Sequence, residues 1–311
     1  MEVKAKCGRI ALIIVCLCQS YHGLSQTDST YIMRYNKHLT LKGFLYDNFI
    51  SLNVKEANQS KGTEYESNNT NGIGIGLVHP KLPFEITLGY NYSRKKNNDY
   101  LRTRAFDLQF HNYGRSYVVD LYFQQYKGLY IDDPELSFKE ANRPDLSILT
   151  SAIVGQYILN SNKFSYEAAY NQNERQIKSA GSILIGGGLY YFKIRSDNTS
   201  ALGNLPNVES YQLGLNAGYS YNWAISKRWL FNASFSLGAN MVNKDVRRFF
   251  DKNMQVNPTA LFRSSCFYSK NNWHVGLSIV GNMVKAMLNK DTEINLGFGR
   301  TYIKVVRRFG K

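Results

Sequence analysis

The chain has 311 residues, a formal net charge of +15 and four cysteines. Cys7, Cys16 and Cys18 lie before residue 26, so Cys266 is the one cysteine after it, and a disulfide framework within the chain is excluded. No run of about 18 apolar residues follows residue 25, which excludes a transmembrane helix. The positive charge suggests an anionic partner, which is nucleic acid for a soluble protein and a lipid surface for an exported one.

The N-terminus has the pattern of a cleaved secretory signal peptide over residues 1–25. Basic residues at positions 4, 6 and 9 precede an apolar stretch over 10–17, and small residues follow at 23 and 25. The apolar stretch is too short for a membrane anchor, which needs about 20 residues. The pattern therefore predicts export. Removal of the signal, which carries three cations and one acid, leaves a net charge of +13.

Alternation of apolar and polar residues with a period of two dominates the rest of the chain. From 211 to 225 the odd positions hold Tyr211, Leu213, Leu215, Ala217, Tyr219, Tyr221, Trp223 and Ile225. Strands place alternate side chains on opposite faces, so this segment is predicted to be one long two-faced strand. The same pattern marks eleven further segments: 42–54, 70–79, 84–93, 103–112, 117–124, 147–159, 181–194, 229–240, 256–269, 273–279 and 293–308.

Strand length and face chemistry favour a membrane barrel. Many of these segments exceed the roughly five or six residues of a globular strand, and a tilted membrane strand needs about 9–11. Their polar faces hold Asn, Gln, Ser and Gly, which suits a wet or tightly filled lumen. Aromatic residues fall at segment ends, where girdles meet the lipid interfaces: Tyr92, Trp223, Trp229 and Trp273. The alternative, a soluble secreted β-sandwich or solenoid, would have to hide a very large apolar face.

Long and short connections alternate along the chain, as in a barrel with both termini in the periplasm. The connection over 160–180 is the exception, because it is long where a short one is expected. We predict an all-β fold, an antiparallel up-and-down transmembrane β-barrel of about twelve strands. The predicted organisation is a signal peptide over 1–25, a short periplasmic segment over 26–40, and an outer-membrane barrel over 41–309 with a non-strand insert at 160–180.

The region of the insert carries the sequence FSYEAAYNQNERQIKSAGS over residues 164–182. With this segment, the signal peptide and the repeated long strands, the chain resembles the DUF4421 family of exported proteins from Bacteroidota. The resemblance covers nearly all of the chain after the signal. It implies a barrel of unassigned function and supplies no mechanism.

Seven polar residues in and after the insert form the candidate functional cluster: Gln172, Glu174, Arg175, Gln176, Lys178, Ser179 and Ser182. One hypothesis places this cluster in the lumen as a plug. Its charged residues would then pair with lumenal groups, for which the candidates are Asp107, Asp120 and Gln212. The other hypothesis makes the segment a periplasmic turn held by its own hydrogen bonds. The apolar residues between 164 and 170 favour docking, because so much apolar material is unusual in a free loop.

No cofactor, metal ligand or catalytic residue is predicted. The histidines after the signal lack the spacing of metal ligands: His38, His79, His111 and His274. A Ser–His–acid site would have to come from the residues placed on lumen faces, namely Asp107, His111, Asp120, Ser234, Ser236 and His274. Outer-membrane phospholipases carry such groups at the rim of the barrel, and no serine and histidine here share a strand in that arrangement. A triad is recognised by geometry, which the sequence does not supply.

The leading interpretation is a non-enzymatic outer-membrane barrel, either a narrow channel or a structural or assembly component. The alternatives are a lipid-acting outer-membrane hydrolase and a soluble secreted binding protein. The expected partners are outer-membrane lipid and lipopolysaccharide, which basic runs at 94–96 and 247–248 would meet. Barrel assembly machinery would read the last strand, which ends near Phe309. A third basic run, at 307–308, is expected to mark a solvated end. No nucleic-acid partner is expected.

Overall fold

The computed structural model describes residues 27–35, 39–56, 60–68, 71–78, 86–91, 100–133, 135–197, 207–243, 255–288 and 292–309. Its elements are β1 (Ile32–Arg34), β2 (Leu39–Glu56), β3 (Thr63–Glu66), β4 (Asn71–Val78), β5 (Ile86–Asn91), β6 (Arg104–Tyr113), β7 (Tyr117–Tyr130), α2 (Phe138–Ala141), β8 (Asn142–Ile158), η1 (Glu167–Asn171), β9 (Glu174–Gln176), β10 (Ala180–Arg195), β11 (Val208–Ala224), β12 (Trp229–Asn243), β13 (Gln255–Lys270), β14 (Trp273–Leu288) and β15 (Thr292–Phe309). None of the described helices is long and apolar enough to cross a lipid bilayer.

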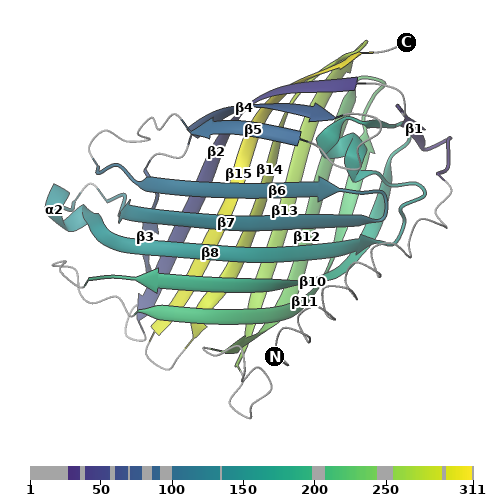
Figure 1. Cartoon of the computed structure of the whole chain (residues 1–311). Helices are drawn as coiled ribbons and strands as arrows, with labels where there is room; N and C mark the ends of the chain where they lie inside the picture. Colours follow the sequence, from purple (N-terminus) through teal and green to yellow (C-terminus); the bar gives the residue numbers. More distant parts are fainter. Residues whose placement is uncertain are drawn as a thin grey trace, which may run out of the picture.

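The long strands close into an antiparallel barrel (Figure 1). From β7 to β15 each long strand pairs with the next one along the chain. β15 then pairs with β2, from Leu39 opposite Phe309 to Glu56 opposite Thr292. The short strand β3 pairs with β2 and meets β7 through Glu66 and Tyr130, which completes a ring of ten strands.

Three further strands extend the wall beside this ring. β4 pairs with β2, β5 pairs with β4, and β6 pairs with β7. All twelve predicted strands are present, so the predicted all-β antiparallel barrel is confirmed. The closed ring has ten strands where about twelve were predicted, because it closes through β3, a strand that the sequence pattern did not predict. Within the described parts of β5 and β6, no pairing joins the two strands.

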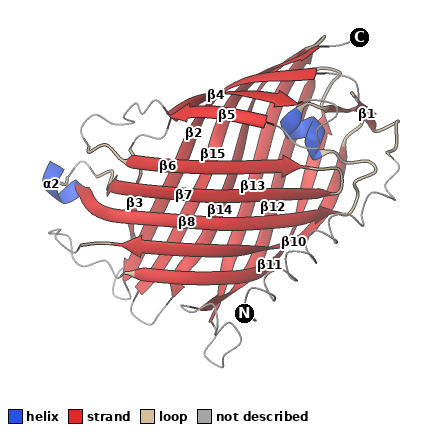
Figure 2. Ribbon diagram, in the orientation of Figure 1, coloured by secondary structure: helices blue, strands red, loops and turns tan. Residues whose placement is uncertain are grey.

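The connections define two ends of the barrel. The terminus end holds the start of β2, the end of β15, the turns at 225–228 and 271–272, and the insert between β8 and β10. The loop end holds the connections that follow β2, β7 and β10. Figure 2 shows α2 at the loop end and the second helix, η1, near β1 at the terminus end. The insert therefore lies at the end of the barrel where the alternation predicts it, although it is longer than the other connections at that end.

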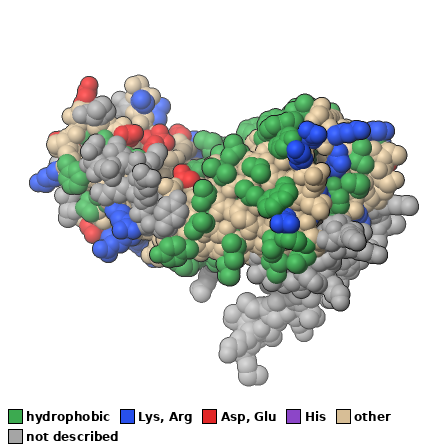
Figure 3. Space-filling view, turned by 90° about the horizontal axis from the view of Figure 1, so that it is seen from above, with side chains coloured by type: hydrophobic (Ala, Val, Ile, Leu, Met, Phe, Trp, Pro, Cys, Tyr) green, Lys and Arg blue, Asp and Glu red, His purple; other side chains and the backbone are tan. Residues whose placement is uncertain are grey.

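The outward face is apolar around the barrel. Leu215 on β11 is 78% exposed, whereas its inward neighbour Asn216 is 5% exposed. The other strands repeat this pattern, with exposed side chains that include Leu45, Ile75, Leu88, Leu108, Phe123, Ile153, Ile185, Phe235, Leu277 and Ile303. In Figure 3 hydrophobic side chains cover the middle of the visible face, and Lys and Arg gather toward both ends. The predicted two-faced strands are confirmed.

Much of the inward face at the loop end is apolar too. A cluster of buried side chains, most of them from β2, β7, β8, β10, β14 and β15, packs together there, and we call it the loop-end core. Beside it β11, β12 and β13 add buried polar side chains, among them Gln212, Asn240 and Asn257. Phe298 and Leu52 are fully buried in the loop-end core, and the Phe298 ring lies 5.2 Å from the Tyr122 ring in an edge contact. This half of the barrel interior therefore packs like the core of a soluble protein.

A layer of buried polar and charged side chains lies beside the loop-end core, toward the terminus end. Asp120 on β7 forms an ion pair with Arg263 on β13, and Arg263 also donates to Gln156 Oε1 at 2.8 Å. Asp107 on β6 pairs with Arg300 on β15 at 3.1 Å. These contacts join opposite walls of the barrel, so the middle of the lumen is occupied by side chains that hold each other.

The filled loop-end core predicts unequal costs for two matched substitutions. Phe298→Ala should lower the free energy of unfolding by about 3–5 kcal/mol, because it leaves a cavity in a packed interior. Phe235→Ala should cost much less, because Phe235 is 53% exposed on the outer face. Urea unfolding of the purified protein in detergent measures both. Equal losses would contradict a packed lumen.

Candidate functional site

The insert over 160–180 enters the barrel with residues 164–176, which are buried or half-buried. It forms the π-helix η1, which is capped by Gln172 with a left-handed backbone (φ 57°), and then β9, which pairs with β1. The apolar side chains from 164 to 170 are all buried, namely Phe164, Tyr166, Ala168, Ala169 and Tyr170, whereas Ile177 is 46% exposed. Apolar groups in a connection between strands must dock onto something, and here they dock onto the lumen wall.

Hydrogen bonds fix the insert to two neighbouring strands. The Tyr170 hydroxyl donates to Asn232 Oδ1 on β12 at 2.8 Å, and the hydroxyls of Tyr166 and Ser234 lie 2.7 Å apart. Ser265 on β13 donates to the carbonyl of Ala169 at 2.8 Å. This part of the insert is therefore docked on the inner wall at the terminus end, and we call the docked insert the plug.

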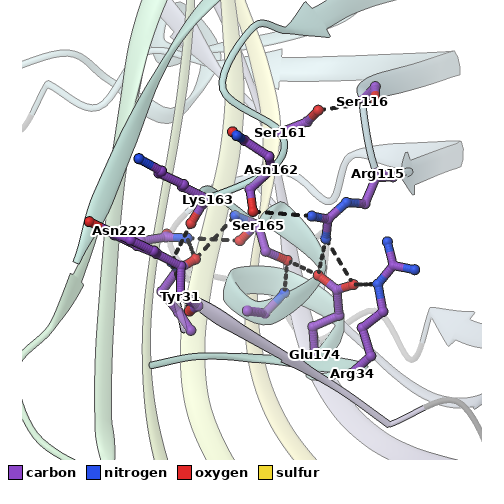
Figure 4. Close-up of polar contacts among 12 residues, drawn as sticks. Tyr31, Arg34, Arg115, Ser116, Ser161, Asn162, Lys163, Ser165, Glu174 and Asn222 are labelled. Carbon is purple, nitrogen blue, oxygen red and sulfur yellow. Dashed lines mark hydrogen bonds and ion pairs between the residues drawn. The ribbon is translucent and has the colours of Figure 1, made fainter. Parts of the chain in front are cut away.

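Glu174 is the centre of an ion cluster that ties the plug to the chain on both sides (Figure 4). Its carboxylate accepts from Arg34 Nε at 3.1 Å and from Arg115 at 3.2 and 3.3 Å. Ser165 also donates to it, at 2.5 Å. Only 6% of the Glu174 side chain is exposed. Removal of its charge would therefore leave the guanidinium groups of Arg34 and Arg115 without their carboxylate partner.

The predicted partners of Glu174 and Arg175 are wrong. Both were expected to meet groups in the middle of the lumen, but Asp107 and Asp120 pair there with Arg300 and Arg263 instead. Arg175 points the other way and donates to the carbonyl of Lys227 in the turn after β11, at 2.8 Å. The sequence placed these residues in the lumen but could not tell which level of it they reach.

The remaining predicted residues divide into two groups. Gln172 and Gln176 are buried within the plug, and Gln176 Oε1 accepts from the Asn222 side chain at 3.0 Å. Ser179 and Ser182 accept from the backbone N–H groups of Ala224 and Asn160, and the Lys178 ammonium lies 5.4 Å from the centre of the Tyr31 ring. These last three side chains join the insert to its surroundings.

Four of the predicted residues line one cavity of about 370 Å³ at the terminus end, which we call the terminal cavity. They are Gln172, Glu174, Arg175 and Gln176, and the other charged or titratable side chains around it are Lys227, Arg228, Lys270, His274 and Arg308. Glu174 is the one acid in this lining, and its charge is already matched by Arg34 and Arg115. The terminal cavity is therefore strongly cationic.

Arg308 is the residue of this cavity that the sequence analysis misjudged. It was expected at a solvated end, but it is 4% exposed, and its guanidinium carbon lies 3.5 Å from the centre of the Tyr35 ring. Its Nη2 donates to the carbonyl of Asn271 at 3.4 Å, while Nε and Nη1 have no partner. Alternation along β15 carried the signal, because it puts Arg308 on the same inward face as Val306.

A buried guanidinium without a carboxylate is costly. No acid forms an ion pair with Arg308 in the described part of the chain. The unpartnered Nε–H and Nη1–H groups point to different sides of the guanidinium, and each can donate to an oxygen of an anion. His274, on the same wall, is buried and also has an unpartnered nitrogen, Nε2. The chemistry that this cavity supports is the binding of an oxyanion.

The candidate catalytic residues do not assemble into a triad. His111 Nδ1 contacts Asp120 at 2.8 Å, but no described serine hydroxyl contacts that ring. His274 Nδ1 contacts Ser269 at 2.7 Å, and no acid completes the group among the described contacts. The described residues also contain no group of three or more His, Cys, Asp or Glu that could hold a metal ion. His38 and His79 lie outside the described residues.

The chain belongs to the DUF4421 family, described as a domain of unknown function, whose model matches residues 26–309. The predicted family resemblance is thereby confirmed. No curated protein matches the chain significantly.

Among solved structures, the chain is similar to the outer membrane protease OmpT from Escherichia coli (9% identity, 89% of this chain and 98% of that one, TM-score 0.39). It is also similar to a bacterial polysaccharide outer membrane secretin (9%, 89% and 99%, TM-score 0.32) and to the P. putida toluene transporter TodX (9%, 88% and 90%, TM-score 0.23). At these values no activity is transferred from them.

The terminal cavity predicts that inorganic phosphate stabilises the protein through Arg308. A ligand that binds only the folded state at a hundred times its Kd adds about 2.7 kcal/mol, so the thermal midpoint of unfolding in detergent should rise with phosphate. Arg308→Gln should abolish the rise. The control Arg195→Gln removes an arginine at the loop end, 48% exposed, and should keep it. A phosphate response that survives in Arg308→Gln would contradict the site.

Proposed function

We propose that the protein is a non-enzymatic component of the Gram-negative outer membrane, a barrel closed to solutes that acts by binding an oxyanion-bearing ligand at its terminus end. The observation that carries this proposal is the filled lumen. The loop-end core, the buried ion pairs and the docked insert follow one another along the barrel. Of the two forms of the leading interpretation, we therefore favour a structural or assembly component over a narrow channel.

The outer surface supports a membrane location. Exposed apolar side chains surround the barrel between its two ends, as a lipid-facing belt requires. Trp223, Trp229 and Trp273 lie at the terminus end and are 40%, 46% and 47% exposed, which fits an aromatic girdle at one lipid interface. β2 begins and β15 ends at this end. Outer-membrane barrels have their short turns on the periplasmic side, so we place this end there.

The proposed partners follow from this location. Lipid and lipopolysaccharide surround such a barrel, and barrel assembly machinery would insert it through the strand that ends at Phe309. The basic runs at 94–96 and 247–248 and the signal peptide over 1–25 lie outside the described residues, so their roles remain predictions. Cell fractionation tests the location, and the mature protein should be heat-modifiable on gels and leave the membrane only with detergent.

A closed lumen predicts that the purified protein does not conduct ions in planar lipid bilayers. Deletion of 171–178 removes β9 and Glu174 but leaves the docked residues 164–170 and the loop-end core, so this variant should also stay closed. Stepwise conductance should appear only when the deletion is combined with Tyr122→Ala and Phe298→Ala, which open the core. Single-channel steps from the intact protein would overturn the proposal, and steps from the deletion alone would show that the plug is the only barrier.

A lipid-facing belt predicts that the same substitution costs more at the bilayer midplane than near an interface. Leu215→Arg, near the middle of β11, should cost about 2–4 kcal/mol of folding free energy in lipid vesicles, and a site near the interface about 0–1. Leu159→Arg is the matched control, because Leu159 is 50% exposed and follows the last residue of β8. Equal costs at the two positions would contradict the membrane placement.

A further inference from the structure

Three buried side chains of the terminal cavity have polar atoms without a partner, and we call these residues its floor. Arg308 and His274 are each 4% exposed, and Gln172 is 2% exposed. The unpartnered atoms are Arg308 Nε and Nη1, His274 Nε2 and Gln172 Oε1. Buried polar groups are nearly always hydrogen-bonded in folded proteins. Three exceptions that share one cavity indicate a site for a ligand.

The floor offers donors for an anion and also one acceptor. Arg308 is cationic and has two free N–H groups. Ser269 Oγ lies 2.7 Å from His274 Nδ1, and when this hydroxyl donates, Nε2 carries the ring proton and becomes a third donor. Gln172 Nε2 already donates to the carbonyl of Ala169 at 3.3 Å, so Oε1 of that amide is left to accept. The ligand therefore needs an anionic group and, within the same cavity, an N–H or O–H.

Apolar side chains complete the lining and narrow the ligand further. Phe267 is 1% exposed and Ala168 is 3% exposed, and Leu230 contributes a half-buried side chain. With about 370 Å³, the cavity is within the range of small-molecule sites. The last residue of a peptide has all three features in one unit, because its carboxylate, its backbone N–H and its side chain share one carbon atom.

The rim of the terminal cavity is formed by four exposed or half-buried cations: Arg175, Lys227, Arg228 and Lys270. No acid among the described residues forms an ion pair with any of them. Charge complementarity steers an oppositely charged partner to such a surface and suppresses like-charged ones. The rim therefore favours a peptide with acidic residues.

The floor faces the lumen and not the bilayer. Arg308 and His274 alternate along β15 and β14 with Arg307 and Trp273, which face outward and lie in contact, 4.9 Å from the guanidinium carbon to the ring centre. A lipid phosphate at the girdle would meet Arg307. The exposed part of the cavity lining belongs to the turns at the terminus end and the strand residues next to them, so Arg308 is reached from that end.

We propose that the terminal cavity captures the C-terminal end of an acidic segment of a periplasmic protein. The free carboxylate would accept from Arg308, the last backbone N–H would donate to Gln172, and the last side chain would lie against Phe267 and Leu230. Acidic residues further along the segment would meet the rim. Capture of a C-terminal carboxylate is a recurring mode of peptide recognition. This inference rests on the proposed function, because it identifies the oxyanion as a carboxylate.

The test is binding of a fluorescent peptide to the purified barrel in detergent, measured by fluorescence anisotropy. The peptide has a dye at its N-terminus, acidic residues in the middle and a final leucine with a free carboxylate. Amidation of this carboxylate should weaken binding about tenfold or more, the scale of one hydrogen bond to a charged group. Arg308→Gln should weaken the free acid by a similar factor and hardly affect the amide, because both changes remove the same contact.

Arg307→Gln is the matched control. It removes the same charge from the neighbouring, outward-facing residue of the same strand, so it should leave binding unchanged. Lys227→Gln on the exposed rim should weaken binding and lower its dependence on salt, because screening acts on exposed charges. Heat-modifiability shows that each variant is folded, and amidation changes the peptide alone, so it tests the carboxylate contact without altering the barrel.

Equal binding of the acid and the amide, or an equal loss in Arg307→Gln and Arg308→Gln, would overturn the proposal. Binding of phosphatidylglycerol through Arg308 more tightly than the peptide would also overturn it, because the site would then take a lipid headgroup. A thermal response to inorganic phosphate through Arg308 without peptide binding would overturn the peptide and keep the oxyanion site. Loss of both responses would overturn the proposed function as well.

Discussion

The contact between β2 and β15 is the one on which the rest of the structure depends. It joins the two ends of the barrel sequence in a single register, from Leu39 opposite Phe309 to Glu56 opposite Thr292. A sheet closed in this way has one inside and one outside, and the period of two then assigns every side chain to one of them. The apolar belt, the loop-end core and the buried arginines all follow from that assignment.

Closure also creates an interior in which every buried charge and polar group needs a partner. Buried charges are tolerated only when they are paired and hydrogen-bonded, and Asp120 with Arg263 and Asp107 with Arg300 meet this condition within the chain. Arg308 does not meet it among the described residues. The terminal cavity is thus a place where the interior is incomplete, and it favours an anion.

The alternation along the chain was enough to predict the barrel, twelve of its strands and their outward-facing sides, because strand periodicity is local. Leu215 and Asn216 are adjacent in sequence, and their opposite exposures could be predicted from that fact alone. Burial of the insert's aromatic side chains was also predictable, because Phe164, Tyr166 and Tyr170 are too apolar for a solvated connection. Arg308 could have been placed inward by the same alternation, had the basic run not been interpreted as a solvated end.

Only the tertiary structure decided which strands meet and which charges pair. The missing β5–β6 ladder and the closure through β3 depend on register between strands, which a period of two does not encode. Glu174 pairs with Arg34, 140 residues away in the chain, and Asp120 with Arg263, 143 residues away. The sequence could show that these groups face inward, but their level along the barrel depends on how all the strands are staggered, and this sets both the ion pairs and the terminal cavity.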